Sequence, residues 1–355
     1  MENSKIRTLS ISTDIGVYPQ LFTFVSLPYR AKCKGLNETG NRYVIHTEAI
    51  KLELVSSEAS IAIPTGRVGR LVFAYLSSKI VKKQFGVFVN EYMDQQRRKG
   101  EVITKQEAEE IVIKNISDYT FSLPNITFIS KELFGYKAGK YTKETLNAII
   151  GILRMVISAT SSKPIKNLYI PNHQFTIATE SYISSQTNTN ETDVSRNTFR
   201  LTSDGLKLLL QNAVPICFEE YKEFNPIEQD LLVIFLRKTH NPQLIEKRKL
   251  ALWNMSSLKN DNNFATNGEN LLKQARQTIN YSWLVKQIFN VDTSDTHYSR
   301  YKESLLNAWE TLTKKYSDTD FSFCVSPNDE GFDILGSDDL IGLNAHFNYL
   351  MDDKK

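Results

Sequence analysis

The sequence has few cysteines and histidines, and they form no pattern typical of a metal site or a disulfide framework. The three cysteines, Cys33, Cys217 and Cys324, are isolated, and no pair has the CxxC spacing of a zinc module. The five histidines are solitary, whereas the nicking enzymes of rolling-circle plasmids need paired histidines and a catalytic tyrosine. We therefore expect no metal and no cofactor.

Long apolar runs and a strong charge of one sign are also absent. The longest apolar stretches, such as residues 146–157, are far shorter than the roughly 20 residues of a membrane span, and no charged-then-apolar signal segment opens the chain. The formal net charge is only +3, which excludes the strongly basic composition of a non-specific nucleic-acid coating protein. We expect a cytoplasmic protein in which any DNA-binding surface depends on local clusters of charge.

Familiar catalytic motifs are missing too. Residues 135–142 contain two glycines and a lysine, but a Walker A loop needs four residues between its glycines and Ser or Thr directly after the lysine. HExxH, GxSxG and a glycine-rich Rossmann turn do not occur. We expect that the chain is not an enzyme.

What is present fits two globular domains. Of the 355 residues, 41% are hydrophobic and 23% are charged, which is enough apolar material for two cores. We predict an N-terminal extension over residues 1–60, a first domain over 61–202, a second domain over 203–337 and a C-terminal tail over 338–355.

The first domain is predicted to contain a helix, a helix-turn-helix and a β-hairpin. Apolar residues recur at helical spacing over 67–81, and a charge-rich insertion follows at 90–114. Residues 126–129 are β-prone, Ser130 is expected to cap a short helix, and the turn at 135–139 leads into a long helix with an apolar face reaching Ile157. Extended segments over 168–178 and 198–201, joined by the Ser/Thr/Asn-rich tract 184–197, predict a hairpin, the wing of residues 168–201.

The second domain repeats this order. A helix is predicted to begin at Asn225 and Pro226, because proline is tolerated in the first turn of a helix. After a polar segment at 256–269 come a short helix over 281–289, a long helix over 296–316 and hairpin strands over 321–325 and 331–335. No repeat is visible in the sequence itself. The prediction is an α+β fold, mainly helical, of two tandem winged-helix domains, in which a β-hairpin wing follows each helix-turn-helix.

The starts of the two long helices hold the candidate binding residues. In a helix-turn-helix the second helix enters the major groove with its first residues nearest the base edges. Lysines and hydroxyls position a protein on phosphates, whereas Arg300 can read a guanine edge. Each position also fits a solvated helix start with hydroxyl caps. The candidate DNA-binding residues are Lys131, Lys137, Lys140, Tyr141 and Lys143 in the first domain and Thr293, Ser294, Thr296, His297, Ser299, Arg300 and Lys302 in the second.

Several segments resemble the family of plasmid-encoded RepA-type replication initiators. Residues 66–76 are similar to its opening helix, where glycine and arginine precede a leucine-rich run, and residues 133–142 resemble its leucine-glycine turn and glycine-rich helix entry. The chain differs where residues 288–290, Ile-Phe-Asn, replace a usual Phe-Gly turn, and where the insertion and a long wing lengthen the first domain. Further similar segments follow in the family's order at residues 212–216, 225–236, 283–289 and 301–305.

The resemblance implies a function. Members of this family bind directly repeated origin sites, or iterons, in double-stranded DNA as monomers, form a homodimer that restrains replication, and recruit the host initiator and replicative helicase. A winged-helix transcriptional regulator or autorepressor without initiator activity shares every fold-level feature. A protein-interaction scaffold is a third alternative, which the weak net charge fits.

Overall fold

The computed structural model describes residues 15–165, 168–183, 197–211, 213–239, 277–315 and 325–334. It is a mixed α+β structure, about half helical, with several small antiparallel sheets. The chain divides into two compact units, a larger one (Ser12–Gln229 and Gln287–Asn290) and a smaller one (Met1–Ile11, Asp230–Lys286 and Val291–Lys355). The predicted wing tip, the polar segment at 256–269, most of the strand at 321–325 and the tail at 338–355 lie outside the described residues.

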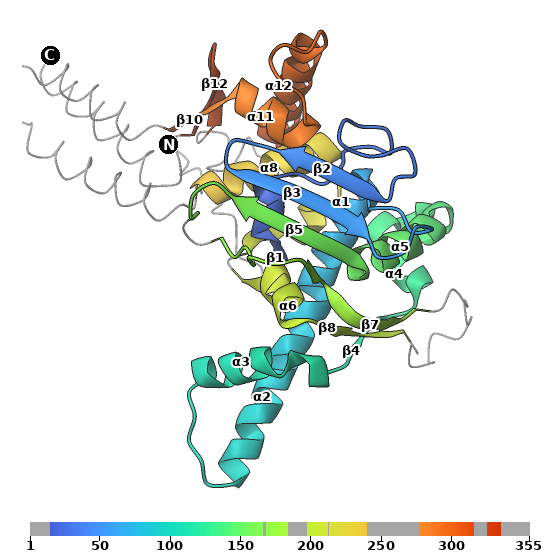
Figure 1. Ribbon diagram of the computed structural model, residues 1–355, viewed down its shortest axis with the longest axis vertical. Helices are drawn as coiled ribbons and strands as arrows, with labels where there is room; N and C mark the ends of the chain where they lie inside the picture. The colour runs from blue at the N-terminus through green and yellow to red at the C-terminus, as the bar shows by residue number, and fades with distance from the viewer. Residues whose placement is uncertain are drawn as a thin grey trace, which may run out of the picture. The chain divides into compact units, whose positions relative to one another are not determined.

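Figure 1 shows the elements of both units with their labels. The smaller unit holds β10 (Gln277–Asn280), α12 (Tyr298–Lys315), β11 (Val325–Pro327) and β12 (Gly331–Ile334), and the division between the units falls within α8 (Pro226–Thr239) and α11 (Tyr281–Phe289). The larger unit contains β1 (Ile15–Tyr18), η1 (Gln20–Thr23), β2 (Arg42–His46), β3 (Ile50–Ser56), α1 (Gly66–Tyr75), η2 (Leu76–Val81), α2 (Lys82–Arg98), α3 (Lys105–Lys114), η3 (Ile116–Asp118), β4 (Phe121–Ser122), α4 (Ile126–Phe134), η4 (Gly135–Lys137), α5 (Ala138–Leu153), β5 (Met155–Ser161), β6 (Phe175–Thr176), β7 (Ala178–Tyr182), β8 (Thr198–Leu201), α6 (Ser203–Leu210), β9 (Val214–Cys217) and α7 (Phe218–Tyr221).

A four-stranded antiparallel sheet in the order β2-β3-β5-β6 lies in the larger unit. In β3, Ile50, Leu52 and Leu54 alternate with more exposed residues and are 0–1% exposed, so one face of the strand lies in the core. Residues 42–56, which the sequence analysis treats as part of an N-terminal extension, therefore supply two strands of this core. Strand β1 pairs in the same way with β9, so residues at both ends of Ser12–Gln229 belong to one unit.

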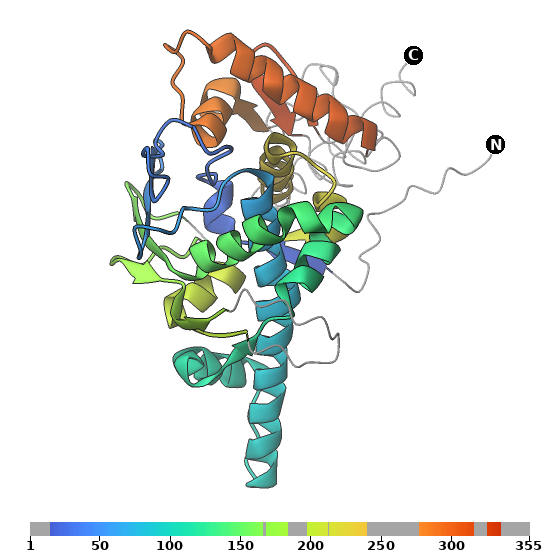
Figure 2. The ribbon, with the colours of Figure 1, turned by 90° about the vertical axis from the view of Figure 1, so that its right-hand side faces the viewer.

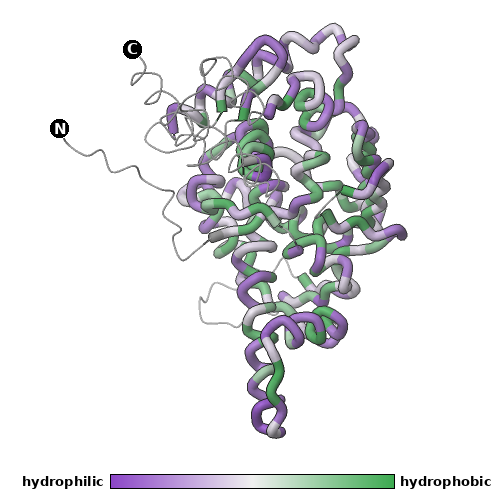
Figure 3. The backbone as a smooth tube through the Cα atoms, turned by 90° about the vertical axis from the view of Figure 1, so that its left-hand side faces the viewer, coloured by the Kyte–Doolittle hydropathy of each residue, from purple (hydrophilic) through white to green (hydrophobic). Residues whose placement is uncertain are grey.

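The predicted helix over 67–81 is present and longer than expected. Helix α1 continues through the π-helical turn η2 into α2, which ends at Arg98, inside the stretch predicted as an insertion. Helix α3 follows, and a capping box between Thr104 and Glu107 fixes its start. The far end of α2 is mostly hydrophilic (Figure 3), as expected for a solvated helix.

Two details of the first helix-turn-helix were predicted wrongly. Residues 126–129 are not a strand but the start of α4, because the Asn125 side chain accepts a hydrogen bond from the Thr127 amide and so caps a helix there. Ser130 lies in the middle of α4 and is not a cap. Its hydroxyl donates to the Ala138 carbonyl (2.8 Å) and so connects α4 to the beginning of α5.

Helix α5 begins at Ala138 and ends at Leu153, so it starts earlier and stops earlier than predicted. Ile157, which was assigned to its apolar face, lies in β5 and is buried where that strand pairs with β3. The pairing of β5 with β3, far earlier in the chain, makes this segment a strand. The apolar spacing alone does not distinguish a strand from the end of a helix here.

The helices predicted in the second half of the chain are confirmed. Helix α8 begins at Pro226, α11 spans the predicted residues 281–289, and α12 lies within the predicted range 296–316. In the last hairpin, β12 lies within the predicted strand 331–335. Of the predicted strand 321–325 only Val325 is described, and it begins β11, which continues to Pro327 and pairs with β12. In the first half, β8 lies at the predicted strand 198–201, but its partner β7 (Ala178–Tyr182) follows the predicted strand 168–178 and overlaps it only at Ala178. The two strands pair as a hairpin with a register shift between Ala178 and Glu180.

The two halves repeat one order of elements. In each, a short strand precedes the helix pair, a hairpin follows it, and the short strand pairs with the last strand of the hairpin. The resulting three-stranded sheets are β4-β8-β7 and β10-β12-β11. In the first half, β5 and β6 are inserted between α5 and the hairpin.

Aligning these elements reveals a sequence repeat that the linear pattern hides. Helix α4 with the residue after it, ITFISKELFG, matches α11 with its next residue, YSWLVKQIFN, at a shared lysine and phenylalanine and at several similar residues. When α5 and α12 are aligned at their first residues, they resemble each other from the third residue of each helix, as KYTKETLNA against RYKESLLNA. The segment between the two helices is longer in the second repeat, so one ungapped alignment cannot match both helix pairs at once.

Both copies of the shorter helix end on a left-handed residue. Gly135 and Asn290 each have φ of 57°, a conformation that glycine adopts freely and that asparagine tolerates better than other residues. The asparagine of the second repeat therefore keeps the positive φ that glycine has in the first. Its amide also donates to the carbonyls of Lys34 (3.2 Å) and Val44 (3.0 Å).

This turn can be tested with two substitutions. We expect Asn290→Ala to lower the free energy of unfolding by about 3 kcal/mol, since it loses two part-buried hydrogen bonds and strains the left-handed backbone. Asn290→Gly loses only the hydrogen bonds and should be more stable than the alanine variant by roughly 1 kcal/mol. Urea denaturation of the three proteins measures both differences. An alanine variant as stable as the glycine variant would contradict the strain argument.

Candidate functional site

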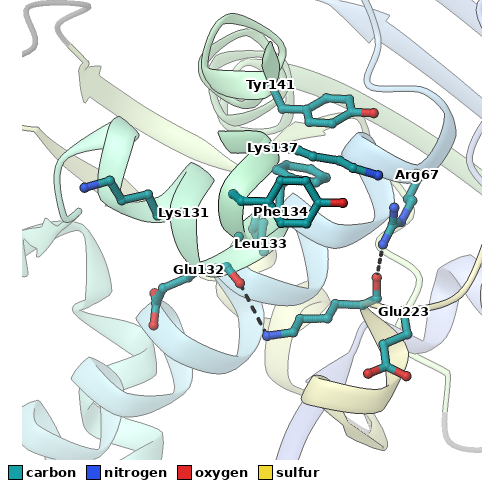
Figure 4. Close-up of a pocket in the computed structure, with 11 residues that line it drawn as sticks. Arg67, Lys131, Glu132, Leu133, Phe134, Lys137, Tyr141 and Glu223 are labelled. Atoms are coloured by element: carbon teal, nitrogen blue, oxygen red, sulfur yellow. Dashed lines mark hydrogen bonds between the residues drawn. The ribbon is translucent and has the colours of Figure 1, made fainter. Parts of the chain in front are cut away.

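The predicted residues of the first repeat lie around the turn between α4 and α5. Lys131 is on α4, Lys137 ends η4, and Lys140, Tyr141 and Lys143 occupy the first turns of α5. All four lysines are exposed, and Tyr141 is half-buried. Figure 4 shows Lys137 and Tyr141 on the same side of this turn, whereas Lys131 points away from them.

Aromatic rings support the cations at this turn. The rings of Phe134 and Tyr141 stack with their centroids 4.4 Å apart. The Lys140 ammonium lies 5.7 Å from the Tyr141 ring, and the Lys137 ammonium lies 5.4 Å from the ring of Tyr136, which is 93% exposed. Tyr141 therefore has a packing role that the sequence analysis did not assign to it, and its hydroxyl is the part that remains for a ligand.

A pocket of about 290 Å³ lies beside this turn, and it includes two cations that the sequence analysis missed. The Arg67 guanidinium donates to the Lys222 carbonyl, and the Lys222 ammonium reaches the Glu132 carbonyl at 3.5 Å (dashed lines in Figure 4). The same ammonium forms an ion pair with Glu219. Arg67 and Lys222 are far apart in the sequence, so no local pattern connects them.

Carboxylates moderate the positive charge of this pocket. Glu132 and Glu223 lie in its lining, and the Glu132 carboxylate accepts a hydrogen bond from the Tyr75 hydroxyl. Burial, together with this carboxylate, raises the pKa of Tyr75 above its usual range, so the phenol stays protonated and remains a donor. The pocket is therefore a mixed polar site and not a purely cationic one.

Two glycines and a proline place α5 against α1. Helix α5 crosses α1 (Figure 2), and Gly69 of α1 and Gly151 of α5 both lie against Pro64. A Cβ atom at Gly151 would lie 2.8 Å from the Ala62 carbonyl oxygen, which is closer than real Cβ contacts allow, and 3.1 Å from Pro64 Cγ, which is tighter than most. The orientation of the candidate residues on α5 thus depends on the absence of a side chain at Gly151.

A comparison of two glycines on α5 tests this packing. We expect Gly151→Ala to lower the free energy of unfolding by about 1–3 kcal/mol because the added methyl group overpacks the contact. Gly139→Ala is the matched control, since a Cβ there meets nothing within 4 Å and alanine favours the helix. Thermal or urea unfolding should rank Gly151→Ala below the unsubstituted protein and Gly139→Ala at or above it. The reverse order would exclude the proposed close contact.

The predicted residues of the second repeat lie before and within the first turns of α12. Thr293, Ser294, Thr296 and His297 are exposed in the turn before the helix, and Ser299 and Arg300 are exposed in its first turn. The side chain of Asp295 accepts a hydrogen bond from the His297 amide (2.9 Å), which helps to order the start of the helix. This carboxylate adds a negative charge close to the candidate residues.

Lys302 differs from the other candidates because it packs within its own unit. Its ammonium lies 4.4 Å from the centre of the Tyr281 ring and donates to the Asp329 carbonyl at 3.3 Å. These contacts connect α12 to α11 and to the turn between β11 and β12. The Lys302 side chain is half-buried, and in this fold its contacts give it a structural role.

We expect Lys302→Met to lower the stability of the smaller unit by about 1 kcal/mol, because methionine keeps the apolar stem but loses the cation–π contact and the hydrogen bond. Lys314→Met, at an exposed position on the same helix, is the matched control and should change stability by only a few tenths of a kcal/mol. Chemical denaturation followed by tryptophan fluorescence compares the two. Equal effects would show that the contacts of Lys302 contribute nothing.

The described residues contain no group of three or more His, Cys, Asp or Glu side chains that could hold a metal ion. Cys33 and Cys217 are free thiols, and burial raises the pKa of Cys33. No helix in the described ranges is long and apolar enough to cross a membrane. Comparisons of the chain with protein-family models, curated proteins and solved structures find no match.

Proposed function

We propose that this chain is a replication initiator of the plasmid RepA type, which binds repeated sites in double-stranded DNA through two winged-helix repeats. The observation that carries the proposal is the duplicated order of strand, two helices and hairpin, with the same strand order in both sheets. A helix-turn-helix followed by a hairpin whose last strand pairs back to the strand before the helices is the arrangement expected of a winged helix. The matching sequences of the two helix pairs support a duplication of one binding unit.

In this proposal α5 and α12 are the recognition helices. The major groove of B-DNA is wide enough to admit a helix, and the residues of its first turns reach the base edges. Lys140 and Lys143 on α5 and Arg300 on α12 are exposed at these positions. The hairpins β7–β8 and β11–β12 are the wings, which add contacts to the backbone of the DNA.

Local clustering makes DNA binding compatible with the weak net charge of +3. Each cation that neutralises a phosphate releases condensed counterions, so a few well-placed lysines give a substantial affinity that falls steeply with salt. The carboxylates of Glu144 on α5 and Glu303 on α12, and that of Glu132 on the neighbouring α4, repel phosphates. They limit non-specific binding and leave the cations at the helix starts as the main electrostatic contacts.

The resemblance to the RepA-type family assigns this DNA binding to origin recognition. A chain with two reading units can occupy two segments of major groove as a monomer, as required for directly repeated sites. In this proposal the bound protein helps to open the adjacent duplex and recruits the host initiator and replicative helicase. A homodimer restrains replication. No cofactor, metal or catalytic step enters the mechanism.

The test is a footprint on the DNA that flanks the gene of this protein, at two salt concentrations. We expect Lys140→Ala and Lys143→Ala each to weaken binding several-fold and to reduce the slope of log affinity against log salt by about 1, because each removes a positive charge from the DNA interface. Lys105→Ala on α3 is the matched control, since this lysine is exposed but lies outside the proposed interface. Its affinity and salt slope should equal those of the unsubstituted protein.

The footprint also separates the alternatives. Evenly spaced protection of short direct repeats supports the initiator, whereas protection of a single palindromic operator supports a winged-helix regulator without initiator activity. If no duplex is protected above non-specific affinity, the DNA-binding proposal fails and a protein-interaction scaffold takes its place.

A further inference from the structure

Helices α5 and α12 agree in exposure along their first turns, and they share residues at several of the aligned positions. The third residue of each is a cation, Lys140 or Arg300, and the tenth is an asparagine, Asn147 or Asn307. From the second residue to the eleventh, exposed and buried positions agree, with only the seventh differing between exposed and half-buried. The two helices therefore present the same face to solvent.

The cation and the asparagine lie on that shared exposed face. With 3.6 residues per turn, positions three, six and ten of a helix fall on one side. This side carries Lys140, Lys143 and Asn147 in α5, and its counterpart in α12 carries Arg300, Glu303 and Asn307. In each helix the asparagine lies about 10 Å along the axis from the cation, at a rise of about 1.5 Å per residue.

Nothing within the fold accounts for an asparagine at this position in both repeats. The side chains of Asn147 and Asn307 are exposed, and neither makes a hydrogen bond within the described part of the chain. Asparagine in a helix interior is less favourable than alanine, so it does not serve to stabilise the helix. Buried positions of a repeat are restrained by packing, but an exposed position is not, and the match there points to a ligand.

We propose that Asn147 and Asn307 are specificity-determining residues that each read an adenine in the major groove. The amide of asparagine carries both a donor and an acceptor and matches the N6 and N7 positions of adenine, a pairing that no other base offers. The cation two turns earlier reads a guanine through O6 and N7. This inference rests on the proposed DNA binding and adds to it the residues and bases that give it sequence preference.

The geometry also predicts how the two sites are related. A separation of about 10 Å along the helix corresponds to roughly three base-pair steps of about 3.4 Å. Each repeat should therefore prefer a guanine and an adenine about three base pairs apart. At the position between the guanine and the adenine the two repeats differ. There Lys143 favours a phosphate or a guanine, whereas Glu303 accepts a hydrogen bond from cytosine N4. The two half-sites are expected to be similar but not identical.

Selection of bound duplexes from a random library tests the inference. The proteins to compare are the unsubstituted chain, Asn147→Ala, Asn307→Ala and Asn90→Ala, the last being an exposed asparagine on α2 outside the proposed interface. The unsubstituted chain and Asn90→Ala should enrich two related motifs, each with a fixed adenine. Asn147→Ala should lose the adenine preference in one motif only, and Asn307→Ala should lose it in the other.

Affinity measurements on the selected duplex complete the test. Each alanine substitution should weaken specific binding roughly 5- to 150-fold and leave binding to unrelated duplex unchanged. The salt slope should also stay the same, because no charge is removed. The unchanged binding to unrelated duplex is the result that distinguishes a base contact from a phosphate contact. The unfolding temperature should stay the same or rise slightly, since both side chains are exposed and alanine favours a helix.

The outcomes separate this inference from the function on which it rests. If the unsubstituted chain selects a sequence and both asparagine variants keep every adenine preference, Asn147 and Asn307 do not read bases, while the proposed DNA binding stands. If the unsubstituted chain selects no sequence at all, the proposed function fails and this inference fails with it.

Discussion

The approach of α5 to α1 at Pro64 is the contact on which the rest of the larger unit depends. Each helix meets the proline with a glycine, Gly69 or Gly151, where a methyl group would collide with backbone or ring atoms. Next to Gly69, the fully buried Arg70 donates to the carbonyls of Leu27, Pro28 and Gly66. A buried guanidinium is stable only when its donors are satisfied, so the segment before α1 has to be in place for this helix to pack. The candidate binding face of α5 is therefore oriented by residues that never reach solvent.

The duplication gives the molecule its second organising feature. The two helix pairs share a shorter helix that ends on a left-handed residue and a longer helix with the same order of exposed and buried positions. Packing explains the similarity of the buried residues, because a methylene gained or lost in a core is costly. It does not explain the similarity on the exposed face, where the cation and the asparagine recur. That difference is the physical basis for assigning recognition to the exposed face.

The electrostatics of the candidate site follow from local geometry more than from composition. Cations gather at the helix starts, but aromatic rings, backbone carbonyls and neighbouring carboxylates hold several of them within the fold, as Lys302 and Lys222 show. Only part of the positive charge is thus available to a ligand. A surface of this kind suits a binding mode in which a few cations set affinity and uncharged side chains contribute the sequence preference.

Elements with local signals could be predicted from the sequence alone. Proline at the start of α8 and the apolar periodicity of α11 and α12 identified these helices close to their observed bounds, and the second strand of the last hairpin was also placed correctly. Two segments were predicted wrongly. Residues 126–129 are β-prone but begin α4, because Asn125 caps a helix there. Ile157 fits the apolar spacing of α5 but lies in β5, because that strand pairs with β3. Other features became apparent only in the folded chain. Strands β2 and β3 join the four-stranded sheet, and Arg67 donates to the Lys222 carbonyl. Asn147 and Asn307 occupy equivalent positions on α5 and α12. These relations depend on contacts between residues far apart in the chain, and neither composition nor spacing encodes them in a form that can be read without the fold.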